Sequence, residues 1–227
     1  MLKLVIGNKI YSTWSIRVIY LLRYYNIPHE EILVPCFHPE SKRLIGEHSP
    51  TGMVPVLKDG DHIIWDSLAI VEYISEKFPD KNIWPRNQKA RSLARSIAAE
   101  IHGGKPKELA SACPFNLGKI FKIPVVSDAI QGELNYMSKQ VKEIQSKFGT
   151  KLTYLFGEFS AADAFYAVTL SRLNTYSIEV PIFLKDYMNL LLEHKIYKEL
   201  TEEAHKERWI IDFAEEKYPV LKDFRGF

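Results

Sequence analysis

The sequence predicts an α/β N-terminal domain followed by an all-α C-terminal domain, and three observations support this prediction. Short apolar strands alternate with helical patterns over residues 1–78, as is typical of an α/β domain. Residues 79–89 carry two prolines and mostly polar side chains, and they are the predicted linker. Residues 90–227 show only helical patterns. A chain of 227 residues can form one large domain or two small ones.

The first half of the α/β domain predicts a strand, a helix and a second strand. Residues 2–6, LKLVI, are a short apolar strand, and residues 15–25 place apolar side chains at helical spacing. Asn26-Ile27-Pro28 ends this helix. Residues 29–35, HEEILVP, are the second strand. A strand–helix–strand unit implies a right-handed parallel crossover.

The second half of this domain adds a hairpin and another helix. Residues 39–48 are polar and predict a short helix. Two strands within residues 54–65 are joined by Asp59-Gly60, a strong hairpin signal. Residues 68–78 then predict an amphipathic helix. The resulting order, β-α-β-α-β-β-α, is the thioredoxin-like arrangement.

Four features organise the C-terminal domain. Residues 90–102 place apolar side chains four apart, and residues 183–218 hold further helical patterns. Ser160 and Asp163 form an S-x-x-D box before an apolar run, which predicts a helix N-terminus. Residues 103–118 interrupt the helical pattern and are a candidate lid or pocket wall.

The composition argues against several classes of protein. The net charge is +2 without a block of like charges, so neither a nucleic-acid-binding nor a membrane-surface protein is indicated. No apolar run approaches the ~18 residues of a membrane span. Cys36 and Cys113 are far apart in sequence, and the histidines lack metal-ligand spacing. We therefore expect a soluble cytoplasmic protein without a metal.

Three local segments resemble the cytosolic glutathione transferase family. TGMVPVLKDGD resembles that family's loop with a valine before a cis-proline, WDSLAIVEYI its acidic residue and serine at the third helix, and GEFSAADAF its buried capping box. NKIYSTWSIR looks most like bacterial members with a theta- or zeta-type serine. The resemblance implies the glutathione transferase fold, with residues 1–78 binding glutathione as co-substrate, and a homodimer.

The same resemblance places the candidate catalytic hydroxyl. Ser12 falls where theta- and zeta-type transferases carry their catalytic serine. A hydroxyl that donates to an anionic sulfur at a helix N-terminus favours the thiolate. Serine is also a favoured N-cap, so spacing alone leaves both roles open. We expect Ser12 to be catalytic and Ser15 to be the cap or a substitute donor, while Tyr11 is a further candidate hydroxyl.

Glutathione binding is assigned to two segments by the resemblance. Val54 precedes a predicted cis-Pro55 and would pair its backbone with the cysteinyl part of glutathione, although a trans proline stays open. Asp66 and Ser67 would hold the γ-glutamyl end, because a helix N-terminus favours an anion. Asp66 is equally a good N-cap.

The glycine end and the electrophile are less well defined by the sequence. Lys42 is the candidate cation for the glycine carboxylate, although the neighbouring Arg43 and a purely solvated role for both stay open. Met53 stands where related enzymes place a basic or amide residue. Trp14 either lines the acceptor pocket or packs, and His102 is expected to pack.

The predicted activity is conjugation of the glutathione thiolate to an electrophilic small molecule. One alternative is a glutathione-dependent isomerase of a maleyl-type acid. The other is a catalytically silent binding or regulatory protein, because fold alone does not determine function.

Overall fold

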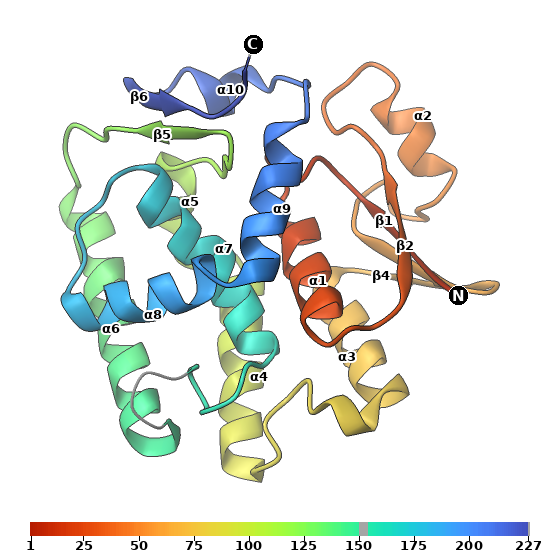
Figure 1. Cartoon of the computed structure of the whole chain (residues 1–227), viewed down its shortest axis with the longest axis horizontal. Coiled ribbons are helices and arrows are strands. Elements are labelled where there is room, and N and C mark those ends of the chain that lie inside the picture. Colours follow the sequence, from red (N-terminus) through yellow and green to blue (C-terminus); the bar gives the residue numbers. More distant parts are fainter. Residues whose placement is uncertain (150–153, 227) are drawn as a thin grey trace.

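The computed structural model of the chain describes residues 1–149 and 154–226. Figure 1 shows a sheet with its helices on one side of the molecule and a larger group of helices on the other. The predicted fold class, a thioredoxin-like α/β part followed by a helical part, is confirmed. Among the described residues, no helix is long and apolar enough to cross a membrane.

The four-stranded sheet has the order β2-β1-β3-β4. Its strands are β1 (Leu2–Ile6), β2 (His29–Leu33), β3 (Val56–Asp59) and β4 (His62–Trp65). β1 runs parallel to β2 and antiparallel to β3, and β3 pairs with β4 as a hairpin. Gly60 turns this hairpin at a φ of +64°, a conformation that glycine adopts without steric cost.

Three helices complete the α/β part: α1 (Thr13–Tyr24), α2 (Ser41–Gly46) and α3 (Ser67–Lys77). α1 begins two residues earlier than residues 15–25 predicted, because Ser12 has an extended backbone and caps it. The Oγ atom of Ser12 accepts a hydrogen bond from the backbone N–H of Ser15. The prediction that Ser15 caps this helix is therefore wrong.

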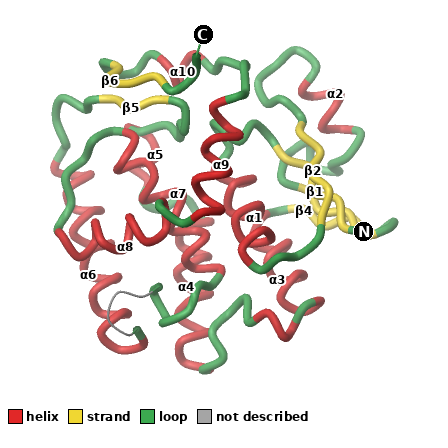
Figure 2. Tube along the Cα trace, viewed as in Figure 1, coloured by secondary structure: helices red, strands yellow, loops and turns green. Residues whose placement is uncertain are grey.

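The rest of the chain is mainly helical. A short turn, η1 (Pro79–Lys81), leads to α4 (Gln88–His102), α5 (Lys107–Ala112), α6 (Asp128–Phe148), α7 (Ala161–Thr175), α8 (Ile182–Leu192), α9 (Lys195–His205) and α10 (Asp212–Glu215). Figure 2 also shows a small antiparallel pair, β5 (Lys119–Phe121) with β6 (Val220–Asp223). The sequence did not predict this pair, because its partners are short and lie about a hundred residues apart.

The helix α7 forms the centre of the helical part, because almost every side chain on it is buried. It packs against both α1 and α4, so it joins the helical part to the α/β part. The predicted capping box at its N-terminus is confirmed. The carboxylate of Asp163 accepts hydrogen bonds from the backbone N–H and from the hydroxyl of Ser160.

A network of ion pairs also joins the two parts. Glu31 on β2 lies 2.7 Å from both Lys9 and the guanidinium of Arg23, and Arg23 reaches Glu203 on α9 at 2.7 Å. Burial raises the pKa of Glu31, but hydrogen bonds from His29 and Lys9 and the nearby positive charges outweigh it and lower this pKa to about 2. The network therefore favours the ionised carboxylate.

We expect Glu31→Gln to destabilise the protein by about 1–3 kcal/mol at pH 7, because it removes one of the two acids that Lys9 and Arg23 share and leaves only Glu203. The ordinary pKa of 4.5 applies in the unfolded chain, so the wild-type contribution is present above pH 4.5 and is lost as the pH falls toward 2. Urea unfolding between pH 3 and pH 7 measures this slope.

Glu30→Gln is the matched control for this prediction. Glu30 is exposed on the same strand and meets Lys3 at 3.5 Å, so its removal should change the free energy of unfolding by less than about 0.5 kcal/mol. Equal losses in the two variants would show that the network contributes nothing particular.

Candidate active site

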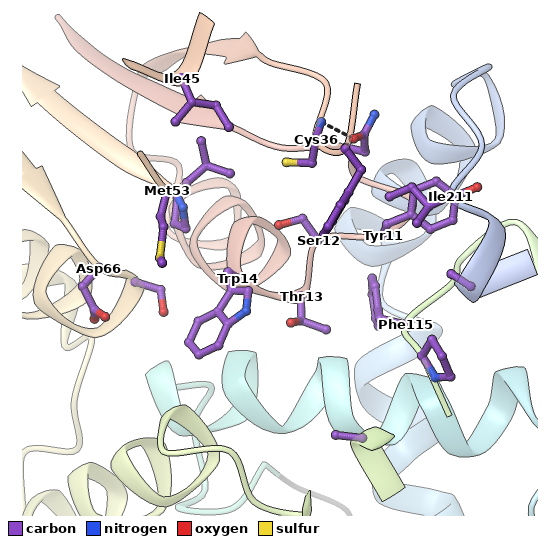
Figure 3. Close-up of a pocket in the computed structure, with 18 of the residues that line it drawn as sticks. Tyr11, Ser12, Thr13, Trp14, Cys36, Ile45, Met53, Asp66, Phe115 and Ile211 are labelled. Atoms are coloured by element: carbon purple, nitrogen blue, oxygen red, sulfur yellow. Dashed lines mark hydrogen bonds between the residues drawn. The ribbon is translucent and has the colours of Figure 1, made fainter. Parts of the chain in front are cut away.

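A cavity of about 1000 Å³ lies between the α/β part and the helical part. Six predicted site residues line it: Ser12, Trp14, Val54, Pro55, Asp66 and Ser67. Figure 3 shows Ser12 near its centre, Asp66 and Met53 toward one end, and Phe115 and Ile211 toward the other. The fold thus brings together residues from three segments of the chain that lie up to 55 positions apart in the sequence.

Ser12 stands at the N-terminus of α1, with its side chain partly open to the cavity. Its hydroxyl donates to the Oγ atom of Ser15 at 2.9 Å. Ser15 is fully buried, and its Oγ atom also accepts the backbone N–H of Gly7 at 3.0 Å. Because a hydroxyl rotates freely, Ser12 can redirect its proton to a ligand, whereas Ser15 does not line the cavity.

The floor behind Ser12 is closely packed. A side-chain carbon added at Gly7 would lie 2.5 Å from the Sγ atom of Cys36, so this position needs glycine. Cys36 lines the cavity, and its backbone N–H donates to the side-chain oxygen of Asn8 at 2.7 Å (Figure 3). Burial raises the pKa of the Cys36 thiol, which keeps it protonated at neutral pH.

The peptide bond between Val54 and Pro55 is cis, as the resemblance implied. Val54 lies just before β3 and lines the cavity. No hydrogen bond joins the backbone of Val54 to another described residue. Its N–H and C=O groups are therefore available to a ligand.

Asp66 and Ser67 form the N-terminus of α3. Asp66 caps the helix by accepting the backbone N–H groups of Leu68 and Ala69, and its other oxygen lies 3.1 Å from the Nε2 atom of His102. Ser67 is buried, and its Oγ atom has no hydrogen-bond partner among the described residues. An unpaired buried hydroxyl on a cavity wall is costly unless a ligand satisfies it.

The hydroxyl of Tyr11 is already engaged. It donates to Glu215, and the guanidinium of Arg225 approaches it at 3.2 Å. Burial and the adjacent Glu215 raise the pKa of Tyr11. Tyr11 therefore stays protonated and bound to the C-terminal segment, which makes it a weaker candidate than Ser12 for a thiolate partner.

Comparison with known proteins agrees with this geometry. Residues 11–77 match the family model of the glutathione S-transferase N-terminal domain. The chain is 26% identical to glutathione S-transferase Z1 of Arabidopsis thaliana over 206 residues, which is 85% of this chain and 87% of that protein. Residues 11–77 therefore match a glutathione S-transferase N-terminal domain, and the chain is similar to a glutathione transferase over most of its length.

This chain is also similar to two further proteins. It is 27% identical to a stringent starvation protein A homolog of Coxiella burnetii over 179 residues, 77% of this chain and 80% of that protein. A glutathione transferase homolog from Burkholderia, solved with bound glutathione, has the same fold at a TM-score of 0.66 and 19% identity, covering 91% of this chain and 99% of that one.

Like Ser15, the predicted residue Lys42 does not reach the cavity. Lys42 is exposed on α2 and is not among the lining residues. The buried face of this helix carries Ser41 and Ile45, and Lys42 is turned by about 100° from Ser41. Ile45, rather than a lysine, is the α2 residue at the cavity.

Sequence reasoning missed several residues that line the cavity. Arg172 lies on the buried helix α7, where nothing in the sequence distinguished it from a surface arginine. His102 was expected to pack; it does meet the ring of Trp14 edge-on at 5.2 Å, but it also pairs with Asp66. Among the described residues, no group of three or more His, Cys, Asp or Glu is placed to hold a metal ion.

Proposed function

We propose that this protein conjugates the thiolate of glutathione to an electrophilic small molecule. The observation that carries the proposal is the meeting of two helix N-termini, Ser12 of α1 and Ser67 of α3, at one cavity with the free backbone of Val54. Each N-terminus favours an anion. One would serve the thiolate and the other the γ-glutamyl carboxylate.

The groups around α3 fit the γ-glutamyl end of glutathione. The unpaired Oγ atom of Ser67 would donate to the carboxylate. Asp66, held in place by His102 and the first turn of α3, would face the ammonium group. Val54 would pair its N–H and C=O groups with the cysteinyl residue in the manner of an added strand. Residues 1–78 would then form the glutathione-binding domain.

The hydroxyl of Ser12 would stabilise the thiolate. A cysteine-type thiol has a pKa near ~8.5, and lowering it by ~2 units requires about 2.7 kcal/mol. A hydrogen bond to a charged group contributes roughly 1.5–3 kcal/mol, and the helix N-terminus adds about 0.3–1 kcal/mol. These two contributions suffice, so the reaction needs no separate general base. The thiolate attacks the electrophilic carbon, the C–S bond forms, and the leaving group departs.

Binding of glutathione is tested with Ser67→Ala. We expect it to weaken the affinity about tenfold or more, because the carboxylate loses a charged hydrogen bond. Isothermal titration calorimetry measures the dissociation constant. The variant should fold normally, since removing an unpaired buried hydroxyl does not cost stability.

Ser138→Ala is the matched control. Ser138 on α6 is also buried, and its Oγ atom has no hydrogen-bond partner within residues 1–149 and 154–226, but it does not line the cavity. Its replacement should leave glutathione affinity unchanged. The same affinity in Ser67→Ala as in Ser138→Ala would refute the assignment of Ser67.

Conjugation itself is tested with glutathione and 1-chloro-2,4-dinitrobenzene, in which the thiolate displaces chloride. Catalysed turnover supports the proposal. Glutathione binding without turnover would favour the isomerase of a maleyl-type acid. Neither binding nor turnover would favour a catalytically silent protein, a possibility consistent with the relative named as a stringent starvation protein A homolog. We further propose that the protein is a homodimer, as expected for its family.

A further inference from the structure

The half of the cavity away from Asp66 has an apolar wall. Its residues come from the segment around α5 and from the C-terminal segment: Ala110, Pro114, Phe115, Ile211, Phe213 and Ala214. Phe37 reaches over from the α/β part and meets the ring of Phe213 edge-on at 5.6 Å. These side chains form a surface suited to a flat, apolar molecule.

Arg172 places a positive charge in this apolar region. Arg172 is the one lysine or arginine among the described residues that line the cavity. Its Nε atom donates to the carbonyl of Cys113 at 2.9 Å, and one terminal nitrogen donates to the carbonyl of Val168 at 3.4 Å. Its guanidinium lies 5.6 Å from the ring centroid of Phe115.

No aspartate or glutamate of the described part of the chain neutralises this guanidinium. Within residues 1–149 and 154–226, Arg172 takes part in no ion pair with an aspartate or glutamate. Burial lowers the pKa of Arg172 to about 10, so the group remains charged at neutral pH. A partly buried charge paired only with carbonyls stays unfavourable until an anion reaches it.

A second arginine adds to the positive potential nearby. Arg17 is 4% exposed, and its Nε and one terminal nitrogen have no hydrogen-bond partner in the described part of the chain. It is held between the rings of Trp14 and Phe165, at 4.4 Å and 4.9 Å from their centroids. Burial and the charge of Arg172 both lower the pKa of Arg17, which places the two cations close enough to repel each other.

We propose that the electrophile is an organic anion, with its charged group bound by Arg172 and its apolar body against Phe115 and the C-terminal segment. The reaction at Ser12 rests on the proposed function above, but the anion subsite does not. A carboxylate suits this position, because a guanidinium presents paired donors in one plane. The subsite would select acidic electrophiles over neutral ones of the same shape.

Two probes that differ in charge test this proposal: 4-chloro-3,5-dinitrobenzoate and its methyl ester. In both, the glutathione thiolate forms a C–S bond, the C–Cl bond breaks, and chloride leaves. Each enzymatic kcat/KM is divided by the uncatalysed rate constant, which removes the intrinsic difference in reactivity. We expect the wild type to prefer the benzoate by about tenfold or more.

Arg172→Gln should abolish this preference. It should lower kcat/KM for the benzoate about tenfold or more, because KM rises. The kcat/KM for the ester should change by less than about threefold. Arg91→Gln is the matched control: Arg91 is also partly buried and donates to two carbonyls, those of Pro85 and Arg86, but lies outside the cavity. It should leave the preference intact.

Two results would overturn the proposal. One is a wild type without preference for the benzoate. The other is an equal loss with both probes in Arg172→Gln, which would mean that Arg172 only supports the backbone at Cys113. Arg172→Lys, which keeps the charge, should retain part of the preference and serves as a second variant if Arg172→Gln is unstable.

Calorimetric binding of two unreactive compounds separates this proposal from the proposed function. The wild type should bind 3,5-dinitrobenzoate more tightly than 3,5-dinitrobenzamide, and Arg172→Gln should not. This difference without any glutathione binding would refute the transferase activity and keep the anion subsite. Turnover of both chlorinated probes without a charge preference would support the transferase activity and refute the anion subsite.

Discussion

Ser12→Ala is expected to lower kcat/KM for conjugation about 10- to 100-fold near neutral pH and to raise the pKa of bound glutathione by about 1–2 units. The reason is that the Ser12 hydroxyl lines the cavity at the N-terminus of α1 and can rotate its proton from Ser15 toward a ligand. The ultraviolet absorbance of the thiolate, followed as a function of pH, measures this pKa directly. An unchanged pKa in Ser12→Ala would refute the role of Ser12.

The capping role of Ser12 must be separated from its chemistry. Ser12→Ala removes an N-cap and should lower the free energy of unfolding by about 1 kcal/mol. Ser12→Gly should lower it by only about a few tenths of a kcal/mol, because glycine is itself tolerated as an N-cap. Both variants lack the hydroxyl, so we expect the same loss of activity from both. If the loss of activity in the two variants instead followed their loss of stability, Ser12 would act only as an N-cap.

Ser15→Ala provides the opposite pattern. It leaves the buried N–H of Gly7 without an acceptor, which should cost about 1–3 kcal/mol of stability. Because Ser15 does not line the cavity, the pKa of bound glutathione should change less than in Ser12→Ala. A larger change in Ser15→Ala would make Ser15 the thiolate donor.

Asp163→Ala is expected to cause the largest loss of stability, about 3–5 kcal/mol. The carboxylate of Asp163 is fully buried and accepts four hydrogen bonds: from the backbone N–H groups of Leu155 and Ser160, from the Ser160 hydroxyl, and from the Tyr187 hydroxyl at 2.8 Å. Alanine would leave these buried donors unpaired. Urea unfolding monitored by circular dichroism measures the change.

Ser127→Ala is the control for Asp163→Ala. Ser127 caps α6 from an exposed position through a single bond to the backbone N–H of Ile130. Its loss should cost about 1 kcal/mol, because water replaces the missing acceptor. Similar losses in the two variants would show that burial of the Asp163 box adds nothing.

The pKa of Asp163 also predicts a pH dependence of the free energy of unfolding, opposite in sign to the one predicted for Glu31. Burial, only partly offset by its hydrogen bonds, raises the pKa of Asp163 from 3.8 to about 6. The folded state therefore binds more protons than the unfolded state between these values, and stability falls as the pH rises through 6. Asp163→Asn should remove this slope and leave the Glu31 slope below pH 4.5 in place.

Local signals predicted much of the fold correctly. The Asp59-Gly60 turn produced the hairpin of β3 and β4, and the box of Ser160 and Asp163 began α7. Both signals act over a few residues, so no distant partner is needed to interpret them. The β5–β6 pair was missed for the converse reason: its two short strands lie about a hundred residues apart in the sequence and are paired only in the tertiary structure.

The sequence by itself determined the order of most elements, the hairpin and the capping box, because turn residues, caps and periodicity are local properties; the cis-proline was implied by the family resemblance alone. Only the tertiary structure decided that Ser12 and not Ser15 caps α1, that Lys42 points away from the cavity, and that Arg172 lines it without an acid partner. Those outcomes depend on which side of a helix faces a neighbour and on what lies there. Burial and charge pairing across the chain, rather than sequence spacing, set them.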